Sequence, residues 1–278
     1  MKEVLELRIN NTFSTLLPTS IVGDDSGPVT KIKIETGTPE FQSVKEIAEK
    51  VKKEHTESFF YGWSIKRNYN KKEIEHAALF HLIISNVFEP AGEECGTLYD
   101  ETADCEICGS NRKQLTPLTL KQNSIPKKDI SQTIAGEIVI SEKFVIACQQ
   151  RGLKGLITNP IVFNKGNSNF FQLIASSQAE LSQKTIAGIN PFDLSISNEG
   201  EIYKCPKGHT IGLNLLSEPY LLNSPSIKEY DFFESVQKTG IKRGLLRPAP
   251  IYFCSPAFKK MIDEEKLTGF AFEVAHID

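Results

Sequence analysis

Apolar residues recur at two different spacings near the start of the chain, and each spacing predicts a different element. They alternate with polar residues over positions 3–10, which is the period of a β-strand with one buried face. Similar short stretches predict strands at 31–35 and at 59–69, the second of which holds Trp63, the single tryptophan. At 43–54 the apolar positions fall three or four residues apart, which predicts an amphipathic helix.

The most regular helical pattern covers residues 71–85. Ile74, Ala78 and Leu82 form one stripe at helical spacing, and two more apolar residues widen it. A stretch dense in proline, glycine and acidic residues follows, as is typical of a connection. We therefore expect an N-terminal α+β domain over residues 1–88 and a second domain over residues 89–278.

A sequence repeat predicts the organisation of the second domain. An apolar run, a serine, a phenylalanine three residues later, a leucine nine residues further and a glycine two residues beyond that occur twice, 114 positions apart (141 to 255). The serine suits a helix N-cap, the phenylalanine a buried helix face, and Leu-x-Gly a turn into the next strand. The first copy is Ser141, Phe144, Leu153 and Gly155, and the second is Ser255, Phe258, Leu267 and Gly269.

Each copy predicts a strand–helix–strand unit, the first near residues 129–163 and the second near 231–277. Between them, apolar stretches predict strands at 170–174 and 200–204. The expected fold class is therefore α+β, with an N-terminal α+β domain and a second domain that contains two related units.

Composition and charge narrow the functional classes. The chain has 278 residues and a formal net charge of −3, and its lysines and arginines are spread out, so we expect no nucleic-acid partner. No apolar run reaches membrane-spanning length, so we expect no membrane association. The sequence shows no export signal, and we therefore expect a cytoplasmic protein whose six cysteines are reduced.

Two short motifs about a hundred residues apart predict a metal site. The first is Cys105-Glu-Ile-Cys108 followed by Gly109, and the second is Cys205-Pro-Lys-Gly-His209. Each places two ligands on one tight turn, and together they form the Cys₃His set of a closed tetrahedral zinc site. We predict one structural Zn²⁺ held by Cys105, Cys108, Cys205 and His209. The alternatives are a redox-active CxxC, which would need a helix after Cys108, or two unrelated turns.

Two loops carry charged residues of uncertain role. The connection 89–100 holds Glu93, Glu94, Cys95 and Asp100, which form either a binding surface or a solvated link, and we favour the link. Cys95 is the fallback zinc ligand should His209 not bind. The segment 236–250 holds Lys242, Arg243 and Arg247, which either bind an anion or face solvent.

The two motifs and the repeat carry a resemblance that covers residues 88–278. This part of the chain resembles the bacterial double-CxxCG proteins, and its repeat is similar to segments of immunity-type proteins found beside polymorphic toxins. The second motif departs from the family pattern, because His209 stands where the family has a cysteine. The resemblance implies a bacterial cytoplasmic protein with a binding role and no defined reaction.

No enzyme motif for phosphate binding, dinucleotide binding, zinc proteolysis or serine hydrolysis occurs in the sequence, so no catalytic residue is assigned. We expect a non-catalytic, zinc-stabilised binding protein of the toxin-neutralising type, with a toxin as its protein partner. The partner would contact the 89–100 loop or the aromatic residues 59–63. The alternative is a zinc-dependent hydrolase in which three thiolates leave one metal position open for water, with a glutamate of the 89–100 loop as base.

Overall fold

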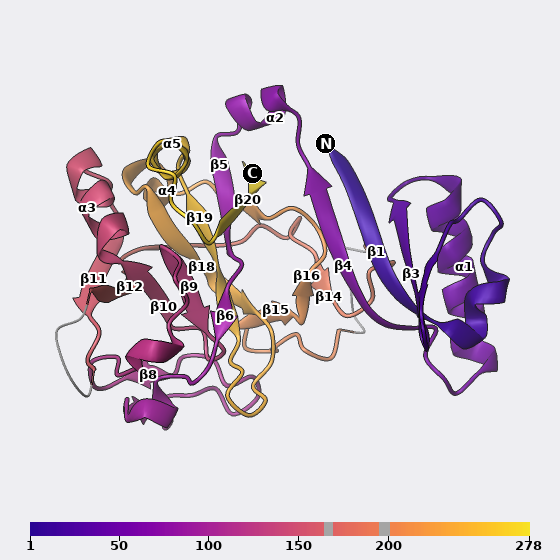
Figure 1. The fold of residues 1–278 in the computed structure, drawn as a ribbon, viewed down its shortest axis with the longest axis horizontal. Helices are drawn as coiled ribbons and strands as arrows, with labels where there is room; N and C mark the ends of the chain where they lie inside the picture. Colours follow the sequence, from indigo (N-terminus) through magenta and orange to yellow (C-terminus); the bar gives the residue numbers. More distant parts are fainter. Residues whose placement is uncertain (164–168, 195–200) are drawn as a thin grey trace. The chain divides into compact units, whose positions relative to one another are not determined.

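A computed structural model describes residues 1–163, 169–194 and 201–278. The chain is a mixed α+β protein (Figure 1). It divides into two compact units: unit 1 comprises Met1–Glu75 and Asn190–Leu194, and unit 2 comprises His76–Ile189 and Ser195–Asp278. Among the described residues, none of the helices is both long and apolar enough to cross a membrane.

Unit 1 is a four-stranded antiparallel sheet in the order β2-β3-β1-β4, with a helix packed on one face. Its elements are β1 (Lys2–Asn10), a 3₁₀ turn (Asn11–Leu16), β2 (Asp24–Ser26), β3 (Val29–Glu35), α1 (Pro39–Glu54), β4 (Phe60–Asn68) and α2 (Lys71–His76), which ends at the boundary. The strands predicted at 3–10, 31–35 and 59–69 and the helix predicted at 43–54 are all present, although α1 begins four residues earlier. It begins there because Thr38 caps its first turn, with Oγ1 accepting a hydrogen bond from Phe41 N, and Pro39 follows.

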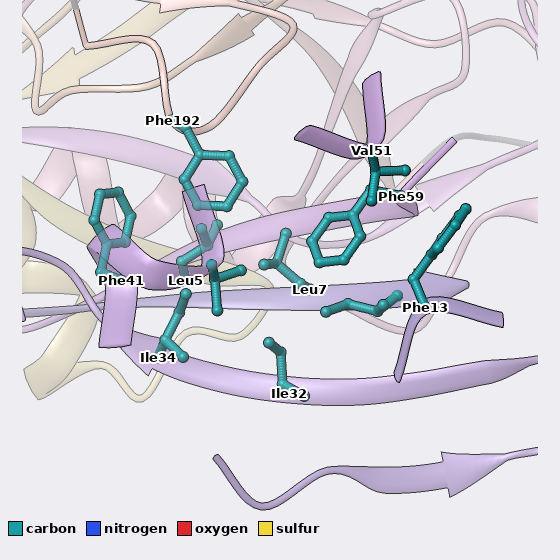
Figure 2. Close-up of a cluster of buried hydrophobic side chains, with 11 residues drawn as sticks. Leu5, Leu7, Phe13, Ile32, Ile34, Phe41, Val51, Phe59 and Phe192 are labelled. Carbon is teal, nitrogen blue, oxygen red and sulfur yellow. The ribbon is translucent and has the colours of Figure 1, made fainter. Parts of the chain in front are cut away.

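The core of unit 1 forms because alternate residues of β1 and β3 face α1. Figure 2 shows these side chains together: Leu5, Leu7, Ile32, Ile34, Phe41, Val51 and Phe59. Phe192 completes the cluster, with its ring centroid 5.3 Å from that of Phe41. Residues 190–194 therefore belong to unit 1, although most of this unit precedes them by more than a hundred positions.

The structure corrects two predictions for residues 71–88. The predicted helix 71–85 stops at His76, and β5 (Leu79–Ile84) takes its place. The predicted boundary at residue 88 lies instead between Glu75 and His76. Both differences have one cause: β5 pairs antiparallel with β19 and β20 in the middle of a sheet, and its adjacent residues Leu79 and Phe80, which point to opposite faces, are both buried. A short strand buried on both faces has a continuous apolar run, which also fits a helical stripe.

Unit 2 contains a five-stranded sheet in the order β11-β12-β10-β9-β6 and a seven-stranded sheet in the order β13-β18-β19-β5-β20-β17, in which β15 also pairs with β18. The elements of the first sheet are β6 (Val87–Phe88), β9 (Ile130–Thr133), β10 (Ile138–Ser141), α3 (Glu142–Arg151), β11 (Leu156–Pro160) and β12 (Phe170–Ala175). Those of the second are β5, β13 (Gln178–Ala179), β15 (Thr210–Gly212), β17 (Tyr220–Leu221), α4 (Pro225–Glu229), β18 (Phe232–Thr239), β19 (Ala249–Cys254), α5 (Pro256–Glu264) and β20 (Phe270–Ile277). Two small sheets pair β7 (Tyr99–Asp100) with β8 (Lys113–Gln114) and β14 (Ala187–Gly188) with β16 (Asn214–Leu215), and 3₁₀ turns cover Glu93–Cys95 and Gln122–Ser124.

The two halves of unit 2 share one arrangement of strands. β10 and β11 flank β12 and are both antiparallel to it, so the path β10-α3-β11 is a split β-α-β unit. β19 and β20 flank β5 in the same manner, around α5. The central strand of the first unit follows it in the chain, whereas that of the second comes from far upstream. Superposition of residues 138–163 on 252–277, with Phe144 over Phe258, stays a prediction.

Within unit 2, the strand that leads into each β-α-β unit is hydrogen-bonded to the turn that follows the helix of the other β-α-β unit. In the first tie, Asp129 accepts hydrogen bonds through Oδ2 from Thr268 N at 2.8 Å and Thr268 Oγ1 at 2.9 Å, and through Oδ1 from Ser141 Oγ at 2.9 Å. Asp129 N and Ile130 N donate to Thr268 O. Ser141 Oγ also accepts from Phe144 N, which is the predicted N-cap of α3.

The second tie repeats the first with the two β-α-β units exchanged. Asp231 Oδ2 accepts from Lys154 N at 2.9 Å, and its Oδ1 accepts from Ser255 Oγ at 2.7 Å. Asp231 N and Phe232 N donate to Lys154 O, and Ser255 caps α5 by accepting from Phe258 N. The repeated serines therefore cap their helices and also hold the aspartate that reaches the opposite unit.

Removal of one aspartate should weaken unit 2 markedly. Asp129→Ala takes an acceptor from three donors, and hydrogen bonds to a charged group contribute about 1.5–3 kcal/mol each when buried. Because Asp129 is partly exposed, we expect a loss of about 2–3 kcal/mol in the free energy of unfolding, measured by urea denaturation. Asp263→Ala, which removes a surface pair one helical turn from Lys259, should cost under about 0.5 kcal/mol. Equal losses for the two variants would contradict the structural role of Asp129.

Three other strand predictions have mixed outcomes. The strand predicted at 170–174 is present as β12, and the strand predicted after the first Leu-x-Gly, up to the end of the first repeat at residue 163, ends at Pro160. The strand predicted at 200–204 is wrong for residues 201–204, which form a turn with one bridge from Lys204 to Ile211, while residue 200 lies outside the described residues. Part of the 236–250 segment extends β18 as far as Thr239 instead of forming a loop.

Candidate metal centre

The first cysteine motif, residues 105–109, forms a tight turn, here called the first knuckle, that presents two thiols. Cys105 N donates to Ser110 O at 2.8 Å, and Gly109 N donates to Cys105 O at 2.7 Å. Gly109 has a φ of +70°, which a glycine adopts without strain, as the sequence predicts. Because the chain folds back within five residues, Cys105 and Cys108 project to the same side of the turn.

The second knuckle, residues 205–209, is closed by an equivalent hydrogen bond. Cys205 N donates to Thr210 O at 2.9 Å, which is again a link from one residue to the fifth one after it. Gly208 takes a φ of +80°, and its N–H donates to Cys205 O at 2.9 Å. His209 O accepts from Lys238 N at 2.8 Å, so that the turn is fixed to β18.

The four predicted ligands lie together. The ligand atoms of Cys105, Cys108, Cys205 and His209 are all within 4.8 Å of one another. Cys105 Sγ lies 3.9 Å from Cys205 Sγ, and His209 Nδ1 lies 3.8 Å from the sulfurs of both Cys108 and Cys205. A tetrahedral ion with metal–sulfur bonds of about 2.3 Å requires sulfur–sulfur edges of about 3.8 Å. The side chains can therefore hold one metal ion without a rearrangement of the two turns.

The electrostatics of the turns favour a thiolate at Cys105. Backbone hydrogen bonds from Cys108 and Ile107 lower the pKa of Cys105 to about 6. Burial raises the pKa of Cys108, so this thiol needs a cation beside it to ionise at neutral pH. A bound metal ion is such a cation.

A second layer of contacts orients His209. Its Nδ1 faces the thiols, and its Nε2 lies 3.4 Å from the side-chain amide of Asn111. An imidazole that binds metal through Nδ1 carries its proton on Nε2, and the amide oxygen of Asn111 is a suitable acceptor once the amide is turned toward the ring. Asn111 follows the first knuckle, so this segment helps to orient a ligand of the second knuckle.

The other cysteines lie apart from this group. Cys95, the fallback ligand, packs beside the apolar cluster around Phe88, Leu118 and Val139. Burial raises the pKa of Cys148 to about 12 and that of Cys254 well above its ordinary value, so both remain neutral thiols. All six cysteines are free of disulfides.

Two acidic residues near the first knuckle, Glu93 and Glu101, form ion pairs with arginines. Glu93 forms ion pairs with Arg112 and, at 3.7 Å, with Arg247. Glu101 lies 3.4 Å from Arg247 Nη2 and 3.5 Å from Arg112 Nε. Arg247 of the 236–250 segment therefore pairs with carboxylates of this chain. The two alternatives for the segment, anion binding or exposure to solvent, did not include such pairing.

Three other charged residues of the two loops, Lys242, Glu94 and Asp100, also have partners within the chain. Lys242 pairs with Asp104 at 3.0 Å, while Arg243 is exposed. Glu94 accepts from Ala91 N, and Asp100 accepts from the backbone and hydroxyl of Thr102. These contacts are local, and with the ion pairs of Glu93 they engage three of the carboxylates of the 89–100 loop, those of Glu93, Glu94 and Asp100.

A buried carboxyl group near the metal centre escaped the sequence analysis. Glu137, immediately before β10, is 8 % exposed. Its Oε1 accepts from Tyr99 Oη at 2.6 Å and from Gly92 N at 3.2 Å. Burial raises the pKa of Glu137 in opposition to these hydrogen bonds. No local motif marks this residue, because its environment comes from segments that lie far away in sequence.

This raised pKa predicts a pH dependence of stability. The native protein binds the proton of Glu137 more tightly than the unfolded chain does, so the free energy of unfolding should fall as the pH rises above 4.5, the ordinary value, and level off above the native pKa. Glu137→Gln keeps an acceptor for Tyr99 and should remove this decline, which makes the variant relatively more stable at pH 8 than at pH 4.

Urea denaturation across this pH range measures the effect, and Glu264→Gln is the opposite-sign control. The hydrogen bond from Arg151 lowers the pKa of Glu264, so its contribution is present at neutral pH and is lost on acidification. A Glu137→Gln variant whose stability stays parallel to that of the wild type at every pH would contradict the assignment.

The chain matches no protein-family model, and no curated protein is significantly similar to it. The resemblance to double-CxxCG and immunity-type proteins therefore rests on the knuckles and the repeat alone.

Proposed function

We propose that Cys105, Cys108, Cys205 and His209 hold one structural Zn²⁺. Three thiol ligands favour a soft or borderline ion, and zinc is the usual occupant of a tetrahedral Cys₃His set. Metal analysis of protein purified without a histidine tag should give about one zinc per chain. A different metal in stoichiometric amount, or folded protein without metal, would overturn this assignment.

We further propose that the protein acts by binding and not by catalysis. The observation that carries this proposal is the presence of four protein ligands within 4.8 Å of one another, which closes a tetrahedral coordination sphere. A catalytic zinc keeps one position for water. The hydrolase alternative also lacks support from the 89–100 loop, since Glu93 is paired with arginines and Glu94 with a backbone N–H.

The proposed partner is a protein, of the toxin class that immunity proteins neutralise, in the bacterial cytoplasm. The resemblance of the knuckles and the repeat supports this class, and six free cysteines fit a reducing compartment. Of the aromatic residues 59–63, Phe59 is in the core of unit 1, whereas Tyr61 is 62 % exposed on β4. Tyr61 is therefore the better candidate for an aromatic anchor at the interface.

Co-expression with the products of the adjoining genes tests this function. We expect one of them to be a toxin that co-purifies with this chain and whose effect on growth the chain suppresses. Tyr61→Ala should weaken that complex at least tenfold, while Leu16→Ala, also exposed in unit 1, should leave it unchanged. Neither complex nor rescue would overturn the binding proposal, whatever the zinc content.

A further inference from the structure

A small cavity of unit 2 lies beside the first knuckle. Its volume is about 220 Å³, below the roughly 300–1,000 Å³ of sites for drug-sized ligands. Residues 109–112 form one wall, directly after the ligand Cys108, and β10, β12, β18 and β19 contribute others. The charged and phenolic side chains that line it are Tyr99, Arg112, Glu137, Glu234, Lys238, Arg247 and Tyr252.

Two buried arginines line this cavity with unused donors. The side chains of Arg112 and Arg247 are 10 % and 11 % exposed. Their Nη atoms pair with Glu93 and Glu101, but neither Nε has a hydrogen-bond partner among the described residues. Arg112 Nε comes no closer to the Glu101 carboxylate than 3.5 Å. A buried N–H without a partner is costly, which indicates that a further acceptor belongs there.

Two carboxyl groups, those of Glu137 and Glu234, also line the cavity. Burial raises the pKa of both Glu137 and Glu234. Glu137 Oε2 is also buried without a hydrogen-bond partner among the described residues, which leaves it able to make a further contact. Three cationic side chains, those of Arg112, Lys238 and Arg247, face the same space. The lining is therefore rich in hydrogen-bond donors.

We propose that this cavity binds a small oxyanion, of the carboxylate or phosphate class, between Arg112 and Arg247. The planar guanidinium groups suit such an anion, and Lys238 adds charge. The cavity lies in unit 2, whereas Tyr61, the proposed anchor for a protein partner, lies in unit 1. Because residues 109–112 form a wall, the metal-bound knuckle keeps the cavity in shape.

Isothermal titration of the zinc-loaded full-length protein with sodium phosphate, and separately with sodium acetate at the same ionic strength, tests the proposal. We expect saturable binding of at least one anion with a Kd below about 1 mM. Binding of phosphate alone or acetate alone assigns the class, and binding of both assigns the shared oxyanion chemistry. No saturable binding of either up to about 10 mM would overturn the proposal.

A matched pair of variants locates the anion. Arg247→Gln should weaken binding at least tenfold, whereas Arg243→Gln removes the same charge from an exposed position of the same segment and should change the Kd less than twofold. If Arg247→Gln does not fold, Arg247→Lys keeps the charge but lacks Nε–H. In the wild type, the NMR signals of the Nε–H groups of Arg112 and Arg247 should shift with the same Kd. Equal weakening in the two glutamine variants, or unmoved Nε–H signals, would overturn the assignment of the site.

Discussion

Replacement of Cys105 by serine should lower the free energy of unfolding by several kcal/mol, on the scale of structural zinc sites. Cys105 and Cys205 are a hundred positions apart, and their sulfurs lie 3.9 Å from each other. A metal ion between them closes a long loop, so that its binding free energy becomes folding free energy and the unfolded chain keeps no equivalent site. The same loss should follow from a strong chelator added to the wild type.

Urea denaturation with and without chelator measures this effect, and Cys95→Ser is the matched control. Cys95 is a partly buried thiol outside the ligand group, so its replacement should cost about 1 kcal/mol or less. The chelator should not destabilise Cys105→Ser further, because the site has already lost a ligand. A Cys105→Ser variant as stable as the wild type, together with a chelator-insensitive wild type, would contradict a structural metal.

Gly155→Ala and Gly269→Ala should each cost more than about 4 kcal/mol or prevent folding. These glycines stand at the same position of the two strand–helix–strand units, with φ of +97° and +101°. A Cβ on Gly155 would lie 1.9 Å from Phe232 O, and one on Gly269 would lie 2.2 Å from Ile130 O. The obstacle is backbone in both cases, so it cannot move aside as a flexible side chain can.

Gly152→Ala separates the contact from the backbone angle. Gly152 ends α3 with a φ of +63°, but a Cβ there meets nothing within 4 Å. It should therefore cost only the left-handed conformation, about 1–2 kcal/mol. Thermal and urea denaturation of the three variants provide the comparison. If Gly155→Ala cost no more stability than Gly152→Ala, the close approach of the two β-α-β units at Phe232 would be absent in solution.

The hydrogen-bonded ties between the two β-α-β units of unit 2 explain why Leu-x-Gly occurs twice. The sequence analysis attributed the glycine to a turn, which accounts for its φ. In the structure the glycine also allows the lead-in strand of the other unit to approach, while the residue before it, Lys154 or Thr268, bonds to the aspartate of that strand. Aromatic packing links the units as well, with the rings of Phe144 and Phe258 5.9 Å apart.

The sequence by itself determined the features that depend on neighbouring residues. The N-caps at Ser141 and Ser255, the positive φ of Gly109 and Gly208, and the strand of residues 2–10 each follow from local backbone chemistry and side-chain periodicity. The four ligands of the candidate metal centre were also predictable, because two tight turns that each present two ligands form a recognisable local pattern.

Tertiary structure alone decided the features that depend on long-range pairing. The run 79–84 is apolar enough for a helix or a strand, and it becomes a strand because β19 and β20 pair with it on either side. Phe192 joins unit 1 across more than a hundred residues, and Glu137 acquires its raised pKa from burial among distant segments, against the hydrogen bonds from Tyr99 and Gly92. No local pattern encodes such partners, since burial and cross-strand pairing are set by segments that meet only when the chain folds.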